Sequence, residues 1–475
     1  MTYIPATWNI SELVQGIYQA PIYHSLFEVL LIIWIIRLLF VKSSKPHRSE
    51  LSEQEKEELI QEWKPQPLVP DTPEDDPGLQ AFIGNNVTSK IAKLVTINGE
   101  EYLNMASMNF LNMIGDQDIE NAAVQCIGKY GVGSCGPRGF YGTVDVHLEL
   151  EEELARFMEC EEAALYSYGF ATIASAIPAY SKRTDVIFCD EGVSFAIQKG
   201  LQASRSKLMF FKHNDMDDLE RLLKEQERDD IKIPKKAGAT RRFLVVEGLY
   251  VNFGDICPLK KLVDFKYKYK VRLFIDESIS FGVLGATGKG VTEHFGVDVN
   301  DIDLITASLE YSLGSIGGFA IGSKFVVDHQ RLSGLGYCFS ASLPPMLAVA
   351  AKEALHKMEN NPSILENLRQ KCQSLYDQLA NLNGLEITGD SMSPILHLRL
   401  AKPCQERKDS LAKLQQIVDK VRESSVILTV ARYLDQEELF LPPPSVRLAV
   451  NCDLSDSEVG KVVEGLKRAC HEVFA

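Results

Sequence analysis

The first hydrophobic pattern in the chain is an apolar stretch close to the N-terminus. Residues 26–41 read LFEVLLIIWIIRLLFV and contain two charged side chains, Glu28 and Arg37. Extended back to residue 22, the stretch approaches the roughly 20 apolar residues that a membrane-spanning helix needs. We therefore expect a transmembrane helix at about 22–41, inside an N-terminal segment of residues 1–50.

Basic residues flank this stretch on one side. Neither Lys nor Arg precedes Arg37, whereas Lys42, Lys45 and Arg48 follow it closely. The positive-inside rule therefore predicts a single pass, with the N-terminus across the membrane and the main body in the cytosol. A cleaved signal peptide is disfavoured, because its first region should be basic. The alternative is a helix that lies in the membrane interface, because a charge sits inside each end of the stretch.

The next segment, residues 51–100, carries a weaker pattern. Ser52 followed by Glu55 is the capping-box signature of a helix start, and apolar residues up to Trp63 then fall on one side of that helix. Five prolines follow within a short distance. We predict an amphipathic helix and then an extended proline-rich linker before the globular body.

From about residue 101 onward, helical periodicity alternates with short β-branched runs. The runs are residues 164–166, 186–189, 243–246, 273–275 and 304–306. Strands that alternate with helices predict an α/β fold in which a mostly parallel sheet is sandwiched by helices. We expect a large domain at 101–340 and a smaller α+β C-terminal domain at 341–475.

Acidic residues follow three of the predicted strands. They are Asp190, Glu247 and Asp276. In parallel α/β sheets, ligands bind beyond the carboxyl ends of the strands. Any one of these acids is explained by a turn or a helix cap, so only the set of three points to a site.

The amino-acid composition limits which kinds of partner the chain can bind and indicates its cellular compartment. Lys and Arg number 50 against 65 Asp and Glu, and this net charge of −15 opposes binding to nucleic acid. The ten cysteines are scattered without a CxxC pair. They are typical of reduced core thiols in the cytosol, and no metal site is predicted.

Six segments from about residue 100 to the end, all in one order, resemble the motifs of the α-oxoamine synthase family. They are GVGSCGPRGFYG at 131–142 with HLELE at 147–151, SYGF at 167–170, EGLY at 247–250 with PL at 258–259, DESISFGVLGATGKG at 276–290, FSASLPP at 339–345 and PPPSVR at 442–447. One glycine-rich match is weak, but six in order are specific. The family condenses an amino acid with an acyl-CoA on pyridoxal phosphate (PLP), and the resemblance implies its fold, PLP-dependent transferase fold type I.

The resemblance also shows what is missing. PLP chemistry needs a lysine amine that holds the cofactor. The family's lysine segment aligns with residues 303–314, which places Ser308 at a conserved family threonine and Tyr311 at the lysine. Tyrosine cannot form the imine, and no lysine lies between Lys289 and Lys324. We therefore predict that the chain alone is inactive.

Other positions that contact the cofactor in the family are also substituted in this chain. Ser194 aligns with the histidine that stacks on the cofactor ring, and Ile279 aligns with the histidine of the D-x-x-H motif. Asp276 is retained at the position that pairs with the pyridine nitrogen. We interpret Ser194, Asp276, Ile279, Ser308 and Tyr311 as vestigial cofactor-site positions. Arg447 aligns with the family's carboxylate-binding arginine.

The family's active sites lie at a dimer interface and are lined by both protomers. The resemblance therefore implies a heterodimer in which a lysine-bearing catalytic homologue binds PLP covalently. This chain would lend side chains from two loops to the partner's site. The candidates are Cys135, Arg138, Phe140, Tyr141 and Ser340. Arg138 would help to hold an anionic group of the substrate or cofactor.

Within the family, a lysine-less chain with an N-terminal membrane helix is similar to the non-catalytic subunits of eukaryotic enzymes that condense L-serine with palmitoyl-CoA. Their product is 3-ketodihydrosphingosine, the first intermediate of sphingolipid synthesis. The resemblance implies the endoplasmic reticulum membrane with a lumenal N-terminus. Small membrane activating subunits and membrane regulators are expected as further partners. Two alternatives stay open: a non-enzymatic membrane scaffold that stabilises the catalytic subunit, and a self-sufficient PLP acyltransferase.

Overall fold

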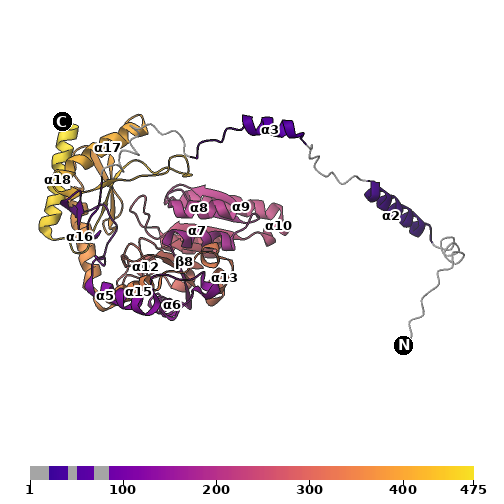
Figure 1. The fold of residues 1–475 in the computed structure, drawn as a ribbon, viewed down its shortest axis with the longest axis horizontal. Coiled ribbons are helices and arrows are strands. Elements are labelled where there is room, and N and C mark those ends of the chain that lie inside the picture. The colour runs from indigo at the N-terminus through magenta and orange to yellow at the C-terminus, as the bar shows by residue number, and fades with distance from the viewer. Residues whose placement is uncertain (1–20, 41–50, 69–84) are drawn as a thin grey trace. The chain divides into compact units, whose positions relative to one another are not determined.

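The computed structural model describes residues 21–40, 51–68 and 85–475. The chain divides into two units, residues 1–83 and 84–475 (Figure 1). In the first unit, helix α2 spans Ile22–Phe40 and is, among the described residues, the one helix long and apolar enough to cross a membrane. The expected helix is confirmed. Its place in a bilayer stays a prediction.

Another helix in the described part of this unit, α3, spans Glu53–Glu62 and begins as the capping box predicts. The Ser52 hydroxyl accepts the Glu55 N–H at 3.2 Å, and the Glu55 carboxylate accepts the Ser52 N–H at 2.7 Å. None of the side chains of α3 is buried. The predicted linker lies, from residue 69 onward, outside the described residues.

The second unit is built on a seven-stranded sheet with the order β3-β9-β8-β7-β6-β4-β5. The strands are β3 Glu162–Tyr166, β9 Gly318–Gly322, β8 Leu304–Ser308, β7 Arg272–Asp276, β6 Arg242–Glu247, β4 Val186–Asp190 and β5 Lys207–Phe211. β9 is antiparallel to both neighbours, and the other pairs are parallel. The predicted mostly parallel sheet is confirmed.

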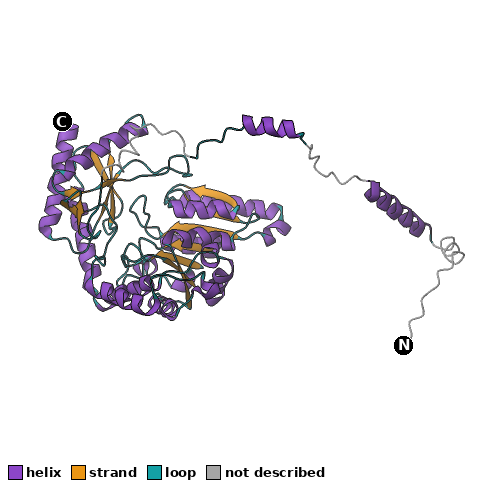
Figure 2. Ribbon diagram, viewed as in Figure 1, coloured by secondary structure: helices purple, strands orange, loops and turns teal. Residues whose placement is uncertain are grey.

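Helices cover both faces of this sheet. Successive strand residues point to opposite faces, and every residue of β4 and β8 is buried. Figure 2 shows the strands enclosed by helices. The helices are α5 Gln117–Tyr130, α6 Asp145–Phe157, α7 Gly169–Tyr180, α8 Phe195–Ser204, α9 Met216–Lys232, α10 Pro234–Ala239, α11 Leu259–Tyr269, α12 Val291–Phe295, α13 Lys324–Ser333, α14 Leu335–Cys338 and α15 Pro345–Asn360, with short turns η1 Arg138–Gly142 and η2 Val299–Asp301.

The C-terminal region carries a second sheet of four antiparallel strands, in the order β10-β11-β14-β13. Its elements are α16 Ser363–Leu379, β10 Leu385–Thr388, β11 Ile395–Leu400, α17 Arg407–Arg422, β12 Val426–Ile427, β13 Thr429–Val430, β14 Val446–Ala449 and α18 Asp456–Phe474. This mixture of strands and helices agrees with the predicted α+β character.

A third sheet joins the two ends of the second unit. Strands β1 (Leu94–Ile97) and β2 (Glu100–Asn104) form a hairpin, and β12 pairs with β2 in parallel. Residues that precede the large sheet in sequence therefore pair with the C-terminal region. The division between the two domains at 340/341 stays a prediction.

Candidate functional site

The three acids predicted from the strand ends lie at the carboxyl edge of the large sheet. Asp190, Glu247 and Asp276 are the last residues of β4, β6 and β7, and all three are buried. Glu247 and Asp276 are direct neighbours in the β6–β7 register. Burial, and then the charge of Asp276, raise the pKa of Glu247 to about 8. This edge therefore holds a protonated carboxyl at neutral pH.

Asp276 is held by its own turn. Its carboxylate accepts the Ser278 N–H at 3.0 Å and the Ser278 hydroxyl at 2.5 Å. Burial raises the pKa of Asp276 to about 6, and these hydrogen bonds oppose the rise. Asp276 thus finds its hydrogen-bond donors within the chain.

Tyr311 lies beside these acids. Burial raises the pKa of its phenol to about 12, and the charges of Glu310 and Asp276 add to the effect. The Tyr311 ring lies 6.4 Å from the ring of Phe110, centroid to centroid. The phenol is neutral near neutral pH, and because it carries no amine it cannot form an imine.

The two lysines nearest to Tyr311 in sequence are engaged elsewhere. Lys289 pairs with Glu159 at 2.6 Å, and Lys324 pairs with Glu162 at 2.5 Å. Neither ammonium group substitutes for the amine that Tyr311 lacks.

The remaining vestigial positions lie around the same edge. The Ser194 N–H donates to the Glu247 carboxylate, and Ser308 and Ile279 are buried. The Ser308 hydroxyl accepts the Glu310 N–H at 3.0 Å. The positions that sequence comparison singled out thus converge, although backbone groups of the chain take up much of their hydrogen-bonding capacity.

An arginine faces Tyr311 from the C-terminal region. Burial lowers the pKa of Arg447, on β14, and the charges of Tyr433 and Tyr311 oppose that effect. Within the described part of the chain, its buried Nε has no hydrogen-bond partner. Arg447 thus brings a cationic group to the edge that the acids line.

The glycine-rich loop 131–142 and the turn 339–345 are hydrogen-bonded to each other. The Ser342 N–H donates to the Gly136 carbonyl at 3.0 Å, and the Ser342 hydroxyl bonds to the Gly142 carbonyl. The Ser134 hydroxyl donates to the Ser342 carbonyl at 2.8 Å. Two segments about 200 residues apart are thus joined directly; their contribution to a partner's site stays a prediction.

Arg138 is turned inward from this loop. Its guanidinium makes a two-pronged ion pair with Glu151 at 2.7 and 3.0 Å, and its Nε donates to the Thr143 hydroxyl at 2.9 Å. The two charged side chains are 4% and 7% exposed. Sequence reasoning missed Glu151 as a partner, although it is the last residue of the HLELE motif. Arg138 therefore anchors the loop from within, and its role toward an anionic ligand stays a prediction.

The other predicted loop residues point outward. Phe140 is 68% exposed and Tyr141 is 95% exposed. The exposed Cys135 thiol donates to the Tyr141 carbonyl at 3.0 Å, and Ser340 is half-buried. Two exposed aromatic rings on a tightly held loop are typical of a surface that meets another protein.

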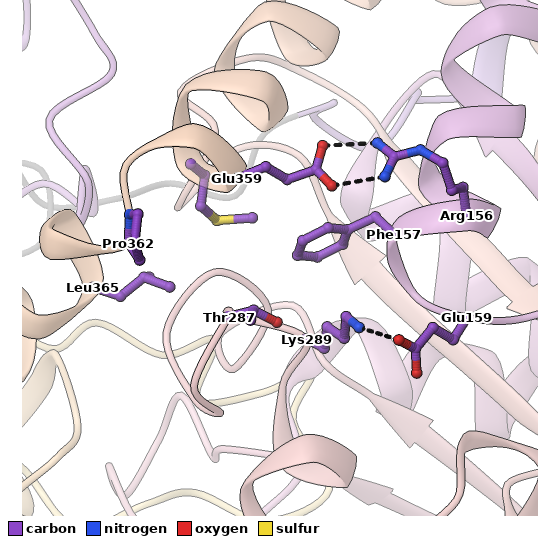
Figure 3. A pocket seen from close by; sticks show the side chains of 9 residues that line it. Arg156, Phe157, Glu159, Thr287, Lys289, Glu359, Pro362 and Leu365 are labelled. Atoms are coloured by element: carbon purple, nitrogen blue, oxygen red, sulfur yellow. Dashed lines mark hydrogen bonds and ion pairs between the residues drawn. The ribbon is translucent and has the colours of Figure 1, made fainter.

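A separate cavity of about 250 Å³ lies between the end of α6, the turn at Thr287 and α15 (Figure 3). Figure 3 shows Arg156 paired with Glu359 and Lys289 paired with Glu159 around an apolar floor that includes Phe157. These charges neutralise each other. The cavity is distinct from the sheet edge where the acids and Tyr311 lie.

Comparison with known proteins shows to which family this chain is similar. Residues 100–466 match the model of the aminotransferase class I and II family. Serine palmitoyltransferase 1 of Dictyostelium discoideum is 45% identical over 452 residues, which cover 92% of each chain. This chain belongs to the serine palmitoyltransferase 1 family. Long chain base biosynthesis protein 1 of Arabidopsis thaliana is 41% identical over 95% of this chain and 92% of its own length.

Solved structures share the fold of this serine palmitoyltransferase 1 family member. A serine palmitoyltransferase from S. paucimobilis, solved with a PLP–myriocin aldimine, superimposes with a TM-score of 0.73 at 23% identity. The match covers 82% of this chain and 93% of the other. An 8-amino-7-oxononanoate synthase from Francisella tularensis gives 0.63 at 22% identity, over 79% and 99%. The predicted PLP-dependent transferase fold type I is therefore confirmed.

The residues of this family member do not fit the cofactor that the fold type carries. The position predicted to correspond to the family's lysine holds the partly buried phenol of Tyr311, and Ser194, predicted to stand at the ring-stacking position, offers no ring to stack. Asp276 and Arg447 keep the residue types that cofactor and substrate would need, but without the amine they cannot complete the site.

Proposed function

We propose that this chain is the lysine-less subunit of a serine palmitoyltransferase, and that it acts only together with a lysine-bearing catalytic homologue. The complex condenses L-serine with palmitoyl-CoA to give 3-ketodihydrosphingosine for sphingolipid synthesis. The observation that carries the proposal is Tyr311. It is a partly buried phenol, beside carboxyl groups, at the position where the chemistry requires an amine.

PLP belongs to the partner in this proposal. The partner's lysine holds the cofactor, which supplies the electron sink for breaking and forming bonds at the serine α-carbon. The relatives' names and the PLP-bound bacterial structure support PLP for the enzyme as a whole. The poor fit of this chain's own residues supports our proposal that the other protomer holds the cofactor.

The contribution of this chain to the partner's site is the surface made by loop 131–142 and turn 339–345. Phe140, Tyr141 and Cys135, which are exposed, and Ser340, which is half-buried, are the candidates for contact across the interface. Arg138 holds the loop in shape through Glu151. A preformed loop loses little conformational entropy when the partner docks, so its side chains can line the partner's cavity at low cost.

The membrane helix gives the complex its location. We propose that α2 crosses the endoplasmic reticulum membrane once, with the N-terminus in the lumen and the body in the cytosol. Small membrane activating subunits and membrane regulators would meet this segment. An N-glycosylation acceptor placed at the N-terminus should be modified, whereas one placed after residue 475 should not.

The decisive experiment combines purification with covalent trapping. A tag on this chain should co-purify a lysine-bearing homologue in equal amount, and the pair should release CoA from palmitoyl-CoA only when L-serine is present. After borohydride reduction, the pyridoxyl group should be found on the partner's peptides. A functional pyridoxyl adduct on this chain, or turnover by this chain alone, would refute the proposal and support the self-sufficient enzyme.

The scaffold alternative predicts a different result for the exposed loop residues. Tyr141→Ala and Phe140→Ala remove side chains that are largely exposed in this protomer, so the fold of the chain should be preserved, and activity is compared in complexes purified at equal stoichiometry. The proposal expects a several-fold fall in activity of the assembled complex. Phe325→Ala, which removes an 81% exposed ring on α13, is the matched control. Unchanged activity in both loop variants would favour a scaffold.

A further inference from the structure

Tyr141 has a backbone conformation that aromatic residues rarely adopt. Its φ is 62° and its ψ is 9°, in the left-handed region, where an aromatic residue is strained and glycine is not. In the described part of the chain, the other non-glycine residues with such a φ are asparagines or follow the end of a helix, where this conformation is common. Tyr141 belongs to neither group, so other contacts must fix its conformation.

Hydrogen bonds within the loop hold this strained turn. The Pro137 carbonyl accepts both the Phe140 N–H at 2.9 Å and the Gly142 N–H at 3.1 Å. The Cys135 thiol donates to the Tyr141 carbonyl at 3.0 Å. The loop therefore keeps Tyr141 in the strained conformation through contacts of this chain alone.

The chain offers the Tyr141 side chain little packing that would compensate for the strain. The side chain is 95% exposed, and that of the adjoining Phe140 is 68% exposed. Strained residues persist where the surrounding structure holds them, and they cluster at functional sites. The contact that this conformation serves therefore lies outside the chain.

The outward surface of the loop is uncharged, which limits what it can bind. Arg138 is the one charged residue in 131–142, and its guanidinium is turned inward onto Glu151 at 2.7 and 3.0 Å. The loop thus has no free cation to hold the carboxylate of serine or the phosphates of CoA. Two exposed aromatic rings suit an alkyl chain instead, because burying apolar surface on both sides is favourable.

We propose that Tyr141 is a specificity-determining residue for the acyl chain of the acyl-CoA substrate. The loop presents its ring, beside that of Phe140, so that it packs against the alkyl chain in the partner's site. The inference rests on the proposed function, in which loop 131–142 lines that site, and it names the substrate group that the loop contacts. The loop then acts on acyl-chain selection and not on serine binding.

The test compares acyl-CoA substrates in the complete complex. This chain is co-purified with its lysine-bearing partner as wild type, as Tyr141→Gly and as Tyr141→Phe. CoA release is measured over a range of concentrations of palmitoyl-CoA, decanoyl-CoA and L-serine. Thermal unfolding of each complex is also recorded, because glycine relieves the strain whereas phenylalanine keeps it. Arg205→Gly, which relieves the same conformation at the exposed end of α8, is the matched control.

We expect Tyr141→Gly to unfold at the Tm of wild type or above it, and to lower kcat/KM for palmitoyl-CoA about tenfold, the scale of one lost aromatic contact. The kcat/KM for decanoyl-CoA should fall less, because the shorter chain has less apolar surface to bury. The KM for L-serine should not change. Tyr141→Phe should lose much less than Tyr141→Gly, because it keeps the ring, and Arg205→Gly should match wild type with both acyl-CoA substrates.

Four outcomes would overturn this inference while leaving the proposed function intact. An unchanged ratio of the two kcat/KM values in an active Tyr141→Gly complex would show that the ring does not select the acyl chain. A rise in KM for L-serine alone would place the ring at the amino acid. Loss of the partner on purification would make Tyr141 an assembly contact, and a clear fall in Tm would show that its conformation is not strained.

Failure of the proposed function gives a different result. A wild-type complex that does not release CoA, or turnover by this chain alone, would overturn the proposed function and this inference with it.

Discussion

Arg138 and Glu151 form an ion pair that is almost fully withdrawn from water. Removing one partner leaves the other charge buried and unpaired, which costs about 3–5 kcal/mol. We therefore expect Arg138→Met to lower the free energy of unfolding by about that amount, as measured by urea denaturation of the purified chain. Arg138→Lys should also destabilise, because an ammonium cannot reproduce the two-pronged contact.

The matched control removes both charges at once. The double variant Arg138→Met with Glu151→Leu should recover much of the lost stability, because no buried charge is left unpaired. If Arg138→Met unfolds at the same urea concentration as wild type, the ion pair does not hold the loop in solution.

His213 is a partly buried histidine whose protonation should change the stability of the protein with pH. Burial lowers the pKa of His213, but the hydrogen bonds that its ring donates to Asp190 and Asp255, together with their charges, outweigh it and raise the pKa to about 9. The ordinary pKa of histidine is about 6.5. The protonated His213 therefore contributes stability that is fully present below about pH 6.5 and is lost as pH rises through about 9.

His213→Gln should flatten this pH dependence. Wild-type unfolding free energy should fall by about 3 kcal/mol between pH 6.5 and pH 9 from this group, whereas the variant should show a much smaller fall. Urea denaturation at several pH values measures it. His471→Gln, at an exposed position near the C-terminus, should behave like wild type. Parallel pH curves for wild type and His213→Gln would contradict the assignment.

At the scale of elements, the glycines of loop 131–142 differ in what they tolerate. A Cβ added at Gly142 would overlap the Gly136 carbonyl, whereas one added at Gly133 would meet nothing within 4 Å. Gly142→Ala should therefore distort the loop and lower the activity of the assembled complex at least about tenfold, the scale of effect that small misplacements at a site produce. Gly133→Ala in the same loop should retain activity. Equal activities of the two variants would show that loop geometry does not matter to the partner.

The β-branched runs predicted five strands of the large sheet, because alternation with helices leaves a strong signal. β9 escaped notice because its sequence, GFAIG, begins and ends with glycine and reads as a turn. The strands β12 and β13 have two residues each and carry no periodicity at all. Their positions depend on pairing with β2 and β14, which are distant in the chain.

The side chains of the candidate site show the same limit on what the sequence can predict. The aligned motifs identified Tyr311, Asp276 and the two loops, because residue type alone decides whether an amine is present. The Arg138–Glu151 pair and the bonds of Ser342 to loop 131–142 could not be predicted, because each depends on how separate segments pack. Sequence specifies which groups are available, whereas the fold decides which of them neutralise each other.

At the scale of the whole molecule, the chain separates into the unit that contains α2 and the body that contains the sheets. The body, residues 84–475, contains the seven-stranded sheet, the four-stranded sheet and the pairing of β2 with β12. We therefore expect a chain that lacks residues 1–50 to fold and to leave the membrane fraction. The reason is that α2 exposes apolar side chains along its whole length, and in the described chain it is the one helix suited to a bilayer.

Carbonate extraction followed by sedimentation measures this release, with the chain expressed apart from any partner. A point variant gives a finer test. Ile33→Asp places a charge near the middle of α2, where insertion costs about 3 kcal/mol, and should shift part of the protein to the soluble fraction. Ile33→Val should stay with the membrane. If the truncated chain still resists carbonate extraction, the body must itself hold the bilayer, and α2 cannot be the sole anchor.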